Sequence, residues 1–229
     1  MANPAVRLAD PAPSTPAEVK WLISRAPVPY EAAVQAMDAR VEAIGAHEAP
    51  ECVWLLEHPA IYTGGTSAAP EELLEPSRFP VFRSGRGGRF TYHGPGQRVA
   101  YVMLDLGRRG RDVRAFVLAL QDWLIVALAR LGVEGGPRHG QIGVFVGEAK
   151  IASIGVRLRR WVSFHGVSLN VDPDLEHFSG IAPCGLAGTH VTSLAALGGE
   201  TDMDHVDAAL RAAFDEVFRA TGISANSSR

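Results

Sequence analysis

Residues 142–171 have the sequence IGVFVGEAKIASIGVRLRRWVSFHGVSLNV, and they set the strand arrangement for much of the chain. Gly147-Glu148 separates two apolar runs, and a pair with glycine in first place suits a tight hairpin turn. The segment therefore predicts one strand over 142–146 and a second over 150–159, joined as a hairpin, with a third strand over 161–171.

Outside this segment, the predicted strands and helices are mixed rather than strictly alternating. Short apolar runs predict strands over 19–23, 52–56 and 98–106. Apolar residues at helical spacing predict helices over 31–45, 112–131 and 204–220, with one or two helical turns over 70–74. This order favours an α+β fold over a doubly wound one.

The length of 229 residues fits one sizeable domain. We predict a disordered tail over residues 1–16, which are rich in alanine and proline, a single domain over 17–222, and a flexible polar tail over 223–229.

The composition excludes several classes of protein. A net charge of −3 gives no overall positive field of the kind that nucleic-acid binding favours. No apolar run approaches the length of a membrane span, and residues 1–16 lack the pattern of a secretory signal. We therefore expect a cytoplasmic protein that binds neither nucleic acid nor a membrane.

Residues 183–189, PCGLAGT, place a thiol between a proline and a glycine. Proline fits poorly inside a helix or a central strand, and glycine lets another molecule approach the main chain. Thr189 is a candidate N-cap of a helix over 189–197, whose N-terminus would favour the thiolate of Cys184. We interpret Cys184 as a nucleophile. Cys52 lies in an apolar run and is interpreted as an unreactive core residue. A disulfide between Cys52 and Cys184 is not expected, because intracellular proteins seldom use structural disulfides.

Lysine is rare in this chain, because only Lys20 and Lys150 among the 22 basic residues are lysines. Alternate side chains of a strand share a face, which would put Lys150 on the apolar face with Ala152 and Ile154. A charge there needs a partner, although a long side chain can also reach solvent from the start of a strand. Lysine can lose its proton where arginine cannot. Its use here favours a functional role, which is to promote a thiolate and to pass a proton to a leaving group.

Residues 85–97, GRGGRFTYHGPGQ, form a glycine-rich segment. It lacks the Gly-Lys-Ser/Thr ending of a phosphate-binding P-loop, and a strand rather than a helix is expected after it. One interpretation of this segment is a tight turn that binds no ligand. The arginines, Tyr92 and His93 favour the other interpretation, a loop that contacts a ligand. Cys184 with His165, His177 and His190 matches no metal-ligand spacing, so we expect no metal. The absence of Gly-x-Ser-x-Gly disfavours a serine hydrolase.

Four ordered motifs together resemble the lipoyl(octanoyl) transferases, also called lipoate–protein ligase B. The resemblance extends from about residue 30 to about residue 220. It implies the α+β fold of the biotin and lipoate ligases, with a mostly antiparallel mixed sheet flanked by helices. The motifs are RGGRFTYHGPGQ over 86–97, KIASIGV over 150–156, FHGVSLNV over 164–171, and PCG over 183–185 with VTSL over 191–194.

The resemblance implies an octanoyltransferase of lipoate biosynthesis and protein lipoylation, with residues 17–222 as its catalytic domain and with no cofactor. The octanoyl group would pass from octanoyl-acyl-carrier protein to a lysine of the lipoyl domains of 2-oxoacid dehydrogenase complexes and of the glycine cleavage H protein. Cys184 would carry an acyl-thioester intermediate and Lys150 would act as acid and base. The residues implied to bind substrate are Arg86, Gly87, Gly88, Arg89, Phe90, Thr91, Tyr92, His93, Ser153, Ile154, Gly155, Gly166, Val167 and Ser168.

Two other functions fit part of the pattern. An ATP-dependent lipoate or biotin ligase shares the implied fold but activates a free acid and needs no cysteine. A non-catalytic protein that binds an acylated carrier needs neither Cys184 nor Lys150. The presence of both residues favours the transferase.

Overall fold

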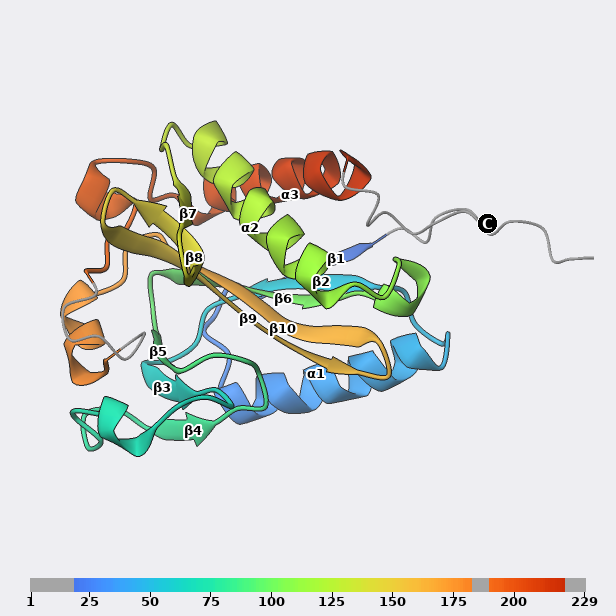
Figure 1. The fold of residues 1–229 in the computed structure, drawn as a ribbon, viewed down its shortest axis with the longest axis horizontal. Coiled ribbons are helices and arrows are strands. Elements are labelled where there is room, and N and C mark those ends of the chain that lie inside the picture. Colours follow the sequence, from blue (N-terminus) through green and yellow to red (C-terminus); the bar gives the residue numbers. More distant parts are fainter. Residues whose placement is uncertain (1–18, 183–189, 221–229) are drawn as a thin grey trace, which may run out of the picture.

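The computed structural model describes residues 19–182 and 190–220, and its centre is a seven-stranded sheet (Figure 1). The strand order is β1-β2-β6-β10-β9-β8-β7. The first pair, β1 and β2, is parallel, and every other pair of neighbours in this sheet is antiparallel. The strands are β1 (Lys20–Ile23), β2 (Cys52–Leu56), β6 (Gln97–Met103), β7 (Gly136–Arg138), β8 (Gln141–Val146), β9 (Ala149–Arg159) and β10 (Val162–Asn170).

A second sheet of three strands, in the order β4-β3-β5, lies beside the first turns of helix α1 (Figure 1). Its strands are β3 (Ile61–Gly64), β4 (Val81–Arg83) and β5 (Phe90–His93). The glycine-rich residues 85–89 form the loop between β4 and β5. Short 3₁₀ helices occur at η1 (Pro70–Glu72), η2 (Leu106–Arg108), η3 (Leu175–Gly180) and η4 (Ala195–Leu197).

Three long helices cover the two faces of the main sheet (Figure 1). Helix α1 (Tyr30–Gly45) packs on one face through residues spaced three or four apart, which is the interval of one helix stripe. Helices α2 (Val113–Arg130) and α3 (Met203–Ala220) pack on the opposite face. The residues of α1 that are buried against the sheet are Ala33, Met37, Val41 and Ile44.

Helix α2 packs against both the main sheet and α3. The helix begins after Asp112, whose side chain accepts a hydrogen bond from the Ala115 N–H, as expected of an N-cap. Trp123 is fully buried, and its Nε1–H donates a 2.7 Å hydrogen bond to the Leu210 carbonyl in α3. The bond satisfies the polar atom of the indole, so the whole ring contributes apolar contact between the two helices.

The structure confirms the predicted α+β class and its mostly antiparallel sheet. The predicted hairpin is present, since Val146 pairs with Ala149 across Gly147-Glu148. The three long predicted helices are found within two residues of their expected ends. Cys52 is a buried free cysteine in β2, as expected.

The helix predicted over 189–197 is wrong for residues 190–194. Lys150 N–H donates to the His190 carbonyl, Thr192 N–H donates to the Lys150 carbonyl, and Leu194 N–H donates to the Asn170 carbonyl. These bonds hold the segment extended beside β9 and β10, and helical structure is limited to the three-residue η4. The argument that a helix N-terminus favours the Cys184 thiolate therefore has no support here.

Several other predictions lie outside the described residues. These are the two tails and the segment 183–189 with Cys184. Within residues 19–182 and 190–220, the helices are too short or too polar to cross a bilayer.

A buried ion pair between β6 and α3 gives a stability prediction. Arg98 Nε lies 2.8 Å from Asp207 Oδ1, and both side chains are 4% exposed. Asp207→Ala leaves a buried guanidinium without its carboxylate and is expected to cost about 3–5 kcal/mol in urea unfolding. Glu216 lies on the same helix as Asp207 and forms an exposed ion pair with Arg130 of α2. Glu216→Ala breaks that pair and is expected to cost less than about 1 kcal/mol. Equal losses in the two variants would contradict this account.

Candidate active site

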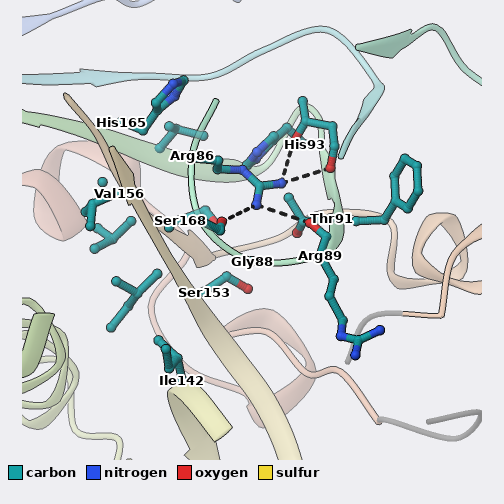
Figure 2. A pocket seen from close by; sticks show the side chains of 18 of the residues that line it. Arg86, Gly88, Arg89, Thr91, His93, Ile142, Ser153, Val156, His165 and Ser168 are labelled. Atoms are coloured by element: carbon teal, nitrogen blue, oxygen red, sulfur yellow. Dashed lines mark hydrogen bonds between the residues drawn. The ribbon is translucent and has the colours of Figure 1, made fainter. Parts of the chain in front are cut away.

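A cavity of about 580 Å³ opens along the middle of β9 (Figure 2). Its walls come from the loop between β4 and β5, from β5, from the neighbouring parts of β9 and β10, and from residues 140–142 before and at the start of β8. Val117 of α2 also lines it. Since α2 covers one face of the sheet and the β4–β5 loop lies toward the other, the cavity continues past the edge of β9 from one face to the other.

Arg86 holds the glycine-rich loop in shape. Its Nη2 donates 2.8 Å hydrogen bonds to the carbonyl and the Oγ1 of Thr63, and its Nη1 donates to the carbonyls of Gly87 and Arg89 (Figure 2). Four bonds from one planar guanidinium fix both ends of the loop against β3. Burial lowers the pKa of Arg86.

The loop lies directly against β9 because glycine is present on both sides of the contact. Gly87 N–H donates to the Val156 carbonyl at 2.9 Å. A Cβ at Gly155 would lie 2.9 Å from Arg86 Cδ, and a Cβ at Gly65 would lie 2.3 Å from the Gly88 carbonyl oxygen. A side chain at Gly155 would push the loop away from β9, and one at Gly65 would push it away from the end of β3.

His165 interrupts the pairing of β10 with β6. It has φ of 60°, a left-handed conformation that is costly for a residue with a side chain. The register of β10 with β6 covers residues 166–170 and omits this position. The ring lies against Tyr101 and stacks on Phe164, on the α1 side of the sheet, and it lines the cavity. Within the described part of the chain, the His165 ring makes no hydrogen bond.

A chain of hydrogen bonds leads from the cavity to the segment after residue 189. His93 Nδ1–H donates to Gln97 Oε1 at 2.6 Å, Gln97 Nε2 donates to Asn170 Oδ1, and Asn170 Nδ2 donates to the Thr192 carbonyl. In this arrangement His93 is neutral, with Nε2 as an acceptor. The network connects β5, β6 and β10 with the residues that follow 183–189.

A third buried histidine, His58, connects the residues just before α1 with β6 through hydrogen bonds. Its Nδ1–H donates to the Val28 carbonyl at 2.6 Å, and its Nε2 accepts from the Tyr101 hydroxyl at 2.7 Å. Tyr101 is one of the cavity residues. Burial lowers the pKa of His58, and burial also lowers the pKa values of His93 and His165 to about 3. These rings are therefore uncharged at neutral pH.

Lys150 lies on the opposite face of β9 from the one that simple alternation predicts. Lys150 pairs with Phe145, whereas Ala152 pairs with Val144, so β9 has one extra residue between the two pairs. Val144, Ala152 and Ile154 pack on the α2 side, and the extra residue moves Lys150 to the other side. Its Nζ lies 5.3 Å from the centre of the Phe145 ring, and the side chain lines the cavity.

The main chain of Lys150 is bonded on both sides to the segment after residue 189. Its N–H donates to the His190 carbonyl at 2.8 Å, and its carbonyl accepts from the Thr192 N–H at 3.0 Å. On the other side of 183–189, Ala182 N–H donates to the Glu72 carbonyl. The Glu72 side chain forms an ion pair with Arg89 of the glycine-rich loop. The described ends of 183–189 are thus connected to the cavity wall, one directly through Lys150 and the other through Glu72 and its ion pair with Arg89.

The cavity brings together almost all of the residues that the sequence predicted to bind substrate. Of the fourteen, Tyr92 is the one that does not line it. Tyr92 points from β5 into an aromatic cluster, where its hydroxyl lies 2.8 Å from His177 Nδ1. Substrate binding by the other thirteen stays a prediction, as do the roles of Lys150 and Cys184, and Cys184 lies outside the described residues.

Sequence reasoning missed ten residues that line the cavity. For His165 a signal was present, because a glycine directly after it interrupts a strand pattern and indicates irregular pairing. Tyr30 and Tyr101 had no such signal, since each fits an ordinary helix or strand stripe. The remaining seven are Thr63, Val99, Val117, Gly140, Gln141, Ile142 and Val156.

The described residues contain no group of three or more His, Cys, Asp or Glu side chains placed to hold a metal ion. The polar side chains that line the cavity are Lys150, the buried Arg86, the partly exposed Arg89, Gln141, neutral histidines and hydroxyls. Such a set suits general acid–base chemistry and hydrogen bonding to an uncharged group.

Comparison with known proteins gives the family. Residues 29–215 match the model of the lipoyl protein ligase A/B catalytic domain. The chain belongs to this family. It is 61% identical over 211 residues to an octanoyltransferase of Hyphomonas neptunium, and the match covers 87% of this chain and 90% of the relative.

Two solved structures have the same fold at low sequence identity. A bipartite lipoate protein ligase from Thermoplasma acidophilum, studied with its lipoyl domain, has a TM-score of 0.65 at 18% identity, over 89% of this chain and 84% of the other. A biotin protein ligase from Aquifex aeolicus has a TM-score of 0.50 at 11% identity, over 89% of this chain and 69% of the other. The predicted likeness to the biotin and lipoate ligases is therefore confirmed for the fold.

The buried histidines predict that the protein loses stability in mild acid. A histidine with a folded pKa of about 3 stays neutral as the pH falls, while the same residue in the unfolded chain takes up a proton near pH 6.5. Stability is therefore lost as the pH falls through 6.5 toward 3. Each such histidine is expected to cost about 2 kcal/mol between pH 7 and pH 5.

His165→Gln tests this in urea unfolding at pH 7 and pH 5. The variant removes one titrating group, so its loss of stability between the two pH values is expected to be smaller than that of the wild type by about 2 kcal/mol. His139→Gln, at an exposed position, is the matched control and should behave like the wild type. A His165→Gln protein with the same acid sensitivity as the wild type would contradict the assignment.

Proposed function

We propose that this chain transfers an octanoyl group from octanoyl-acyl-carrier protein to a lysine of a lipoyl domain through an acyl thioester on Cys184. The octanoyltransferase activity rests on identities of 56–61% to octanoyltransferases over most of the chain. The observation that carries the mechanism is the pairing of the Lys150 main chain with residues 190–192, because it holds the segment next to Cys184 against the lysine that lines the cavity.

In the first half of the reaction, the Cys184 thiolate attacks the carbonyl carbon of the octanoyl thioester. A carbon–sulfur bond to Cys184 forms, and the carbon–sulfur bond to the carrier arm breaks. The leaving thiolate takes a proton from the ammonium group of Lys150. Lysine suits this step because its amine can give up a proton, whereas arginine stays charged.

In the second half, the neutral amine of the acceptor lysine attacks the acyl group on Cys184. The new carbon–nitrogen bond forms as the carbon–sulfur bond to Cys184 breaks. The proton of the attacking amine passes to Lys150, which returns to its ammonium form, and Cys184 returns to the thiolate. Two transfers through one thioester replace a single difficult step, and no cofactor enters.

The cavity suits a medium-length acyl chain. Under the β4–β5 loop, Gly155 and Gly166 have no side chains, and Val99 and Tyr101 are almost fully buried beside them. Each methylene that enters such a space gains about 0.8 kcal/mol. The volume of about 580 Å³ lies within the range of ordinary small-molecule sites.

The lipoyl domains of 2-oxoacid dehydrogenase complexes and the glycine cleavage H protein are the acceptors that we propose. Two points support this choice. The family is that of lipoyl protein ligases, and one structure of the same fold was studied with its own lipoyl domain.

Intact mass spectrometry after mixing with octanoyl-acyl-carrier protein tests the nucleophile. The wild type is expected to gain one octanoyl group, and Cys184→Ala is expected to gain none. Cys52→Ala should gain the group as the wild type does, because Cys52 is buried in β2 and burial raises the pKa of its thiol. An octanoyl adduct on Cys184→Ala would contradict the proposal. Full activity of Cys184→Ser with ATP and free octanoic acid would instead favour a ligase.

The role of Lys150 is tested by the rate at which that adduct appears. Lys150→Ala and Lys150→Arg are both expected to slow acylation by about 100-fold or more, since arginine keeps the charge but does not supply the proton. Arg138→Ala is the control, because Arg138 also lies over the Phe145 ring but does not line the cavity. Normal acylation of Lys150→Arg would show that charge alone is needed and would contradict the proton-transfer role.

A further inference from the structure

The outer edge of β9 has one residue, Ile154, whose main chain is left uncovered within the cavity. Strand β8 pairs with β9 only as far as Ala152, and the glycine-rich loop bonds to β9 at the Val156 carbonyl. Ile154 lies between these two contacts and lines the cavity. The free edge is therefore bordered by β8 on one side and by the loop on the other.

The hydrogen-bonding direction of Ile154 follows from its neighbours. In an antiparallel pair, the main-chain groups of alternate residues point toward the partner strand, and those of the residues between them point away. The Val156 carbonyl points away from β10, because it accepts from Gly87 N–H. Ile154 is two residues earlier in the same regular register with β10, so its N–H and its carbonyl point the same way, into the cavity.

On that side, no other part of residues 19–182 and 190–220 bonds to Ile154. A main-chain N–H and carbonyl at a partly buried position need partners from water or from a ligand. One residue on a free strand edge presents one donor and one acceptor. A trans amide directs its N–H and its carbonyl to opposite sides, so one amide of an extended ligand can bond to one of these two groups.

The free edge also lies at a suitable distance from the reaction centre. Lys150 Nζ would lie 3.4 Å from a Cβ built on Gly143, and the same Cβ would lie 2.6 Å from the Ala152 carbonyl oxygen. The Lys150 amine therefore lies within about 6 Å of the Ala152 carbonyl oxygen. Ile154 is two residues further along the strand, and its Cα is about 7 Å from that of Ala152. In the thiol arm of an acyl carrier, a sulfur and two methylenes separate the thioester carbon from the first amide nitrogen, a span of about 5 Å.

We propose that the main-chain N–H of Ile154 donates a hydrogen bond to the carbonyl of the first amide of the donor's thiol arm. This inference rests on the proposed function, because it assumes that a carrier thioester is the donor. It assigns recognition of the donor to the main chain of β9, at a point where the thioester carbon is held within reach of Lys150. The gap between β8 and the loop has room for the extended arm and leaves the space under the loop for the acyl chain.

Small donors separate the contribution of the amide from that of the acyl group. Three octanoyl thioesters serve, and they are made from N-acetylcysteamine, from its ester isostere 2-mercaptoethyl acetate, and from propanethiol. The first has the amide at the natural distance, the second replaces its N–H by oxygen, and the third has neither group. Rates of acyl-enzyme formation are measured by intact mass without any lipoyl domain, so only the donor is recognised.

The amide donor is expected to acylate the enzyme about 10-fold faster, per unit concentration, than the donor without polar groups, because one modest hydrogen bond is gained. The ester isostere should be intermediate, since it keeps the carbonyl. Equal rates for all three donors would overturn the inference. So would an amide effect that appears only in the later transfer to a lipoyl domain.

A change in the main chain at position 154 locates the effect. Replacing Ile154 by its α-hydroxy acid analogue turns the N–H into an ester oxygen and keeps the side chain. The same replacement at Leu158, whose N–H also lies on the outer edge but which does not line the cavity, is the matched control. The preference for the amide donor is expected to fall by about 10-fold in the first variant and to stay unchanged in the second. An unchanged preference in the first variant would overturn the assignment to Ile154.

The two proposals fail in different ways. If no donor acylates Cys184, the acyl-enzyme mechanism is wrong. If all three donors acylate it at the same rate, the mechanism stands and the role of Ile154 is wrong.

Discussion

The main chain of Lys150 is the point on which the site depends. It bonds to the His190 carbonyl and to the Thr192 N–H, and its side chain lines the cavity. Two main-chain hydrogen bonds therefore hold a segment that is about 40 residues later in the sequence against this one lysine. These bonds involve the main chain and not the side-chain amine of Lys150. The hydrogen bonds from His93 through Gln97 and Asn170 reach the same segment from the cavity.

The irregularity in β9 next to Lys150 has a second effect on the site. The extra residue before Ala152 moves the lysine side chain to the side of the sheet where the glycine-rich loop lies. Without it, Lys150 would point with Ile154 toward α2, into the apolar core. Bulges of this kind are frequent next to active sites because they re-aim one side chain while the strand continues. The left-handed His165 in β10 similarly turns a ring toward the cavity.

Much of the fold could be predicted from the sequence because it follows from local patterns. The hairpin at Gly147-Glu148 and the helix after Asp112 depend on turn and capping chemistry between near neighbours. Most of the cavity could also be predicted, because its residues lie in a few contiguous motifs. Tyr92 is an exception, since alternation along β5 turns its ring into the aromatic cluster while Thr91 faces the cavity.

The features that could not be predicted depend on contacts between distant segments. Periodicity put Lys150 on the apolar face, because a single bulge reverses the alternation and leaves no mark in the composition of the strand. Thr189 resembled an N-cap, but the residues after it bond to β9 and β10 instead of forming a helix. Long-range main-chain pairing outweighs local helix propensity at that point.

The most direct test of the account is the pH dependence of the alkylation of Cys184 by iodoacetamide in a Cys52→Ala background. If Lys150 lies beside the sulfur and favours its thiolate, the midpoint of the rate profile should fall below about pH 7.5, compared with about 8.5 for an unperturbed thiol. Lys150→Met should then shift the midpoint upward by about one pH unit or more. A midpoint near 8.5 that is the same with and without Lys150 would contradict the account.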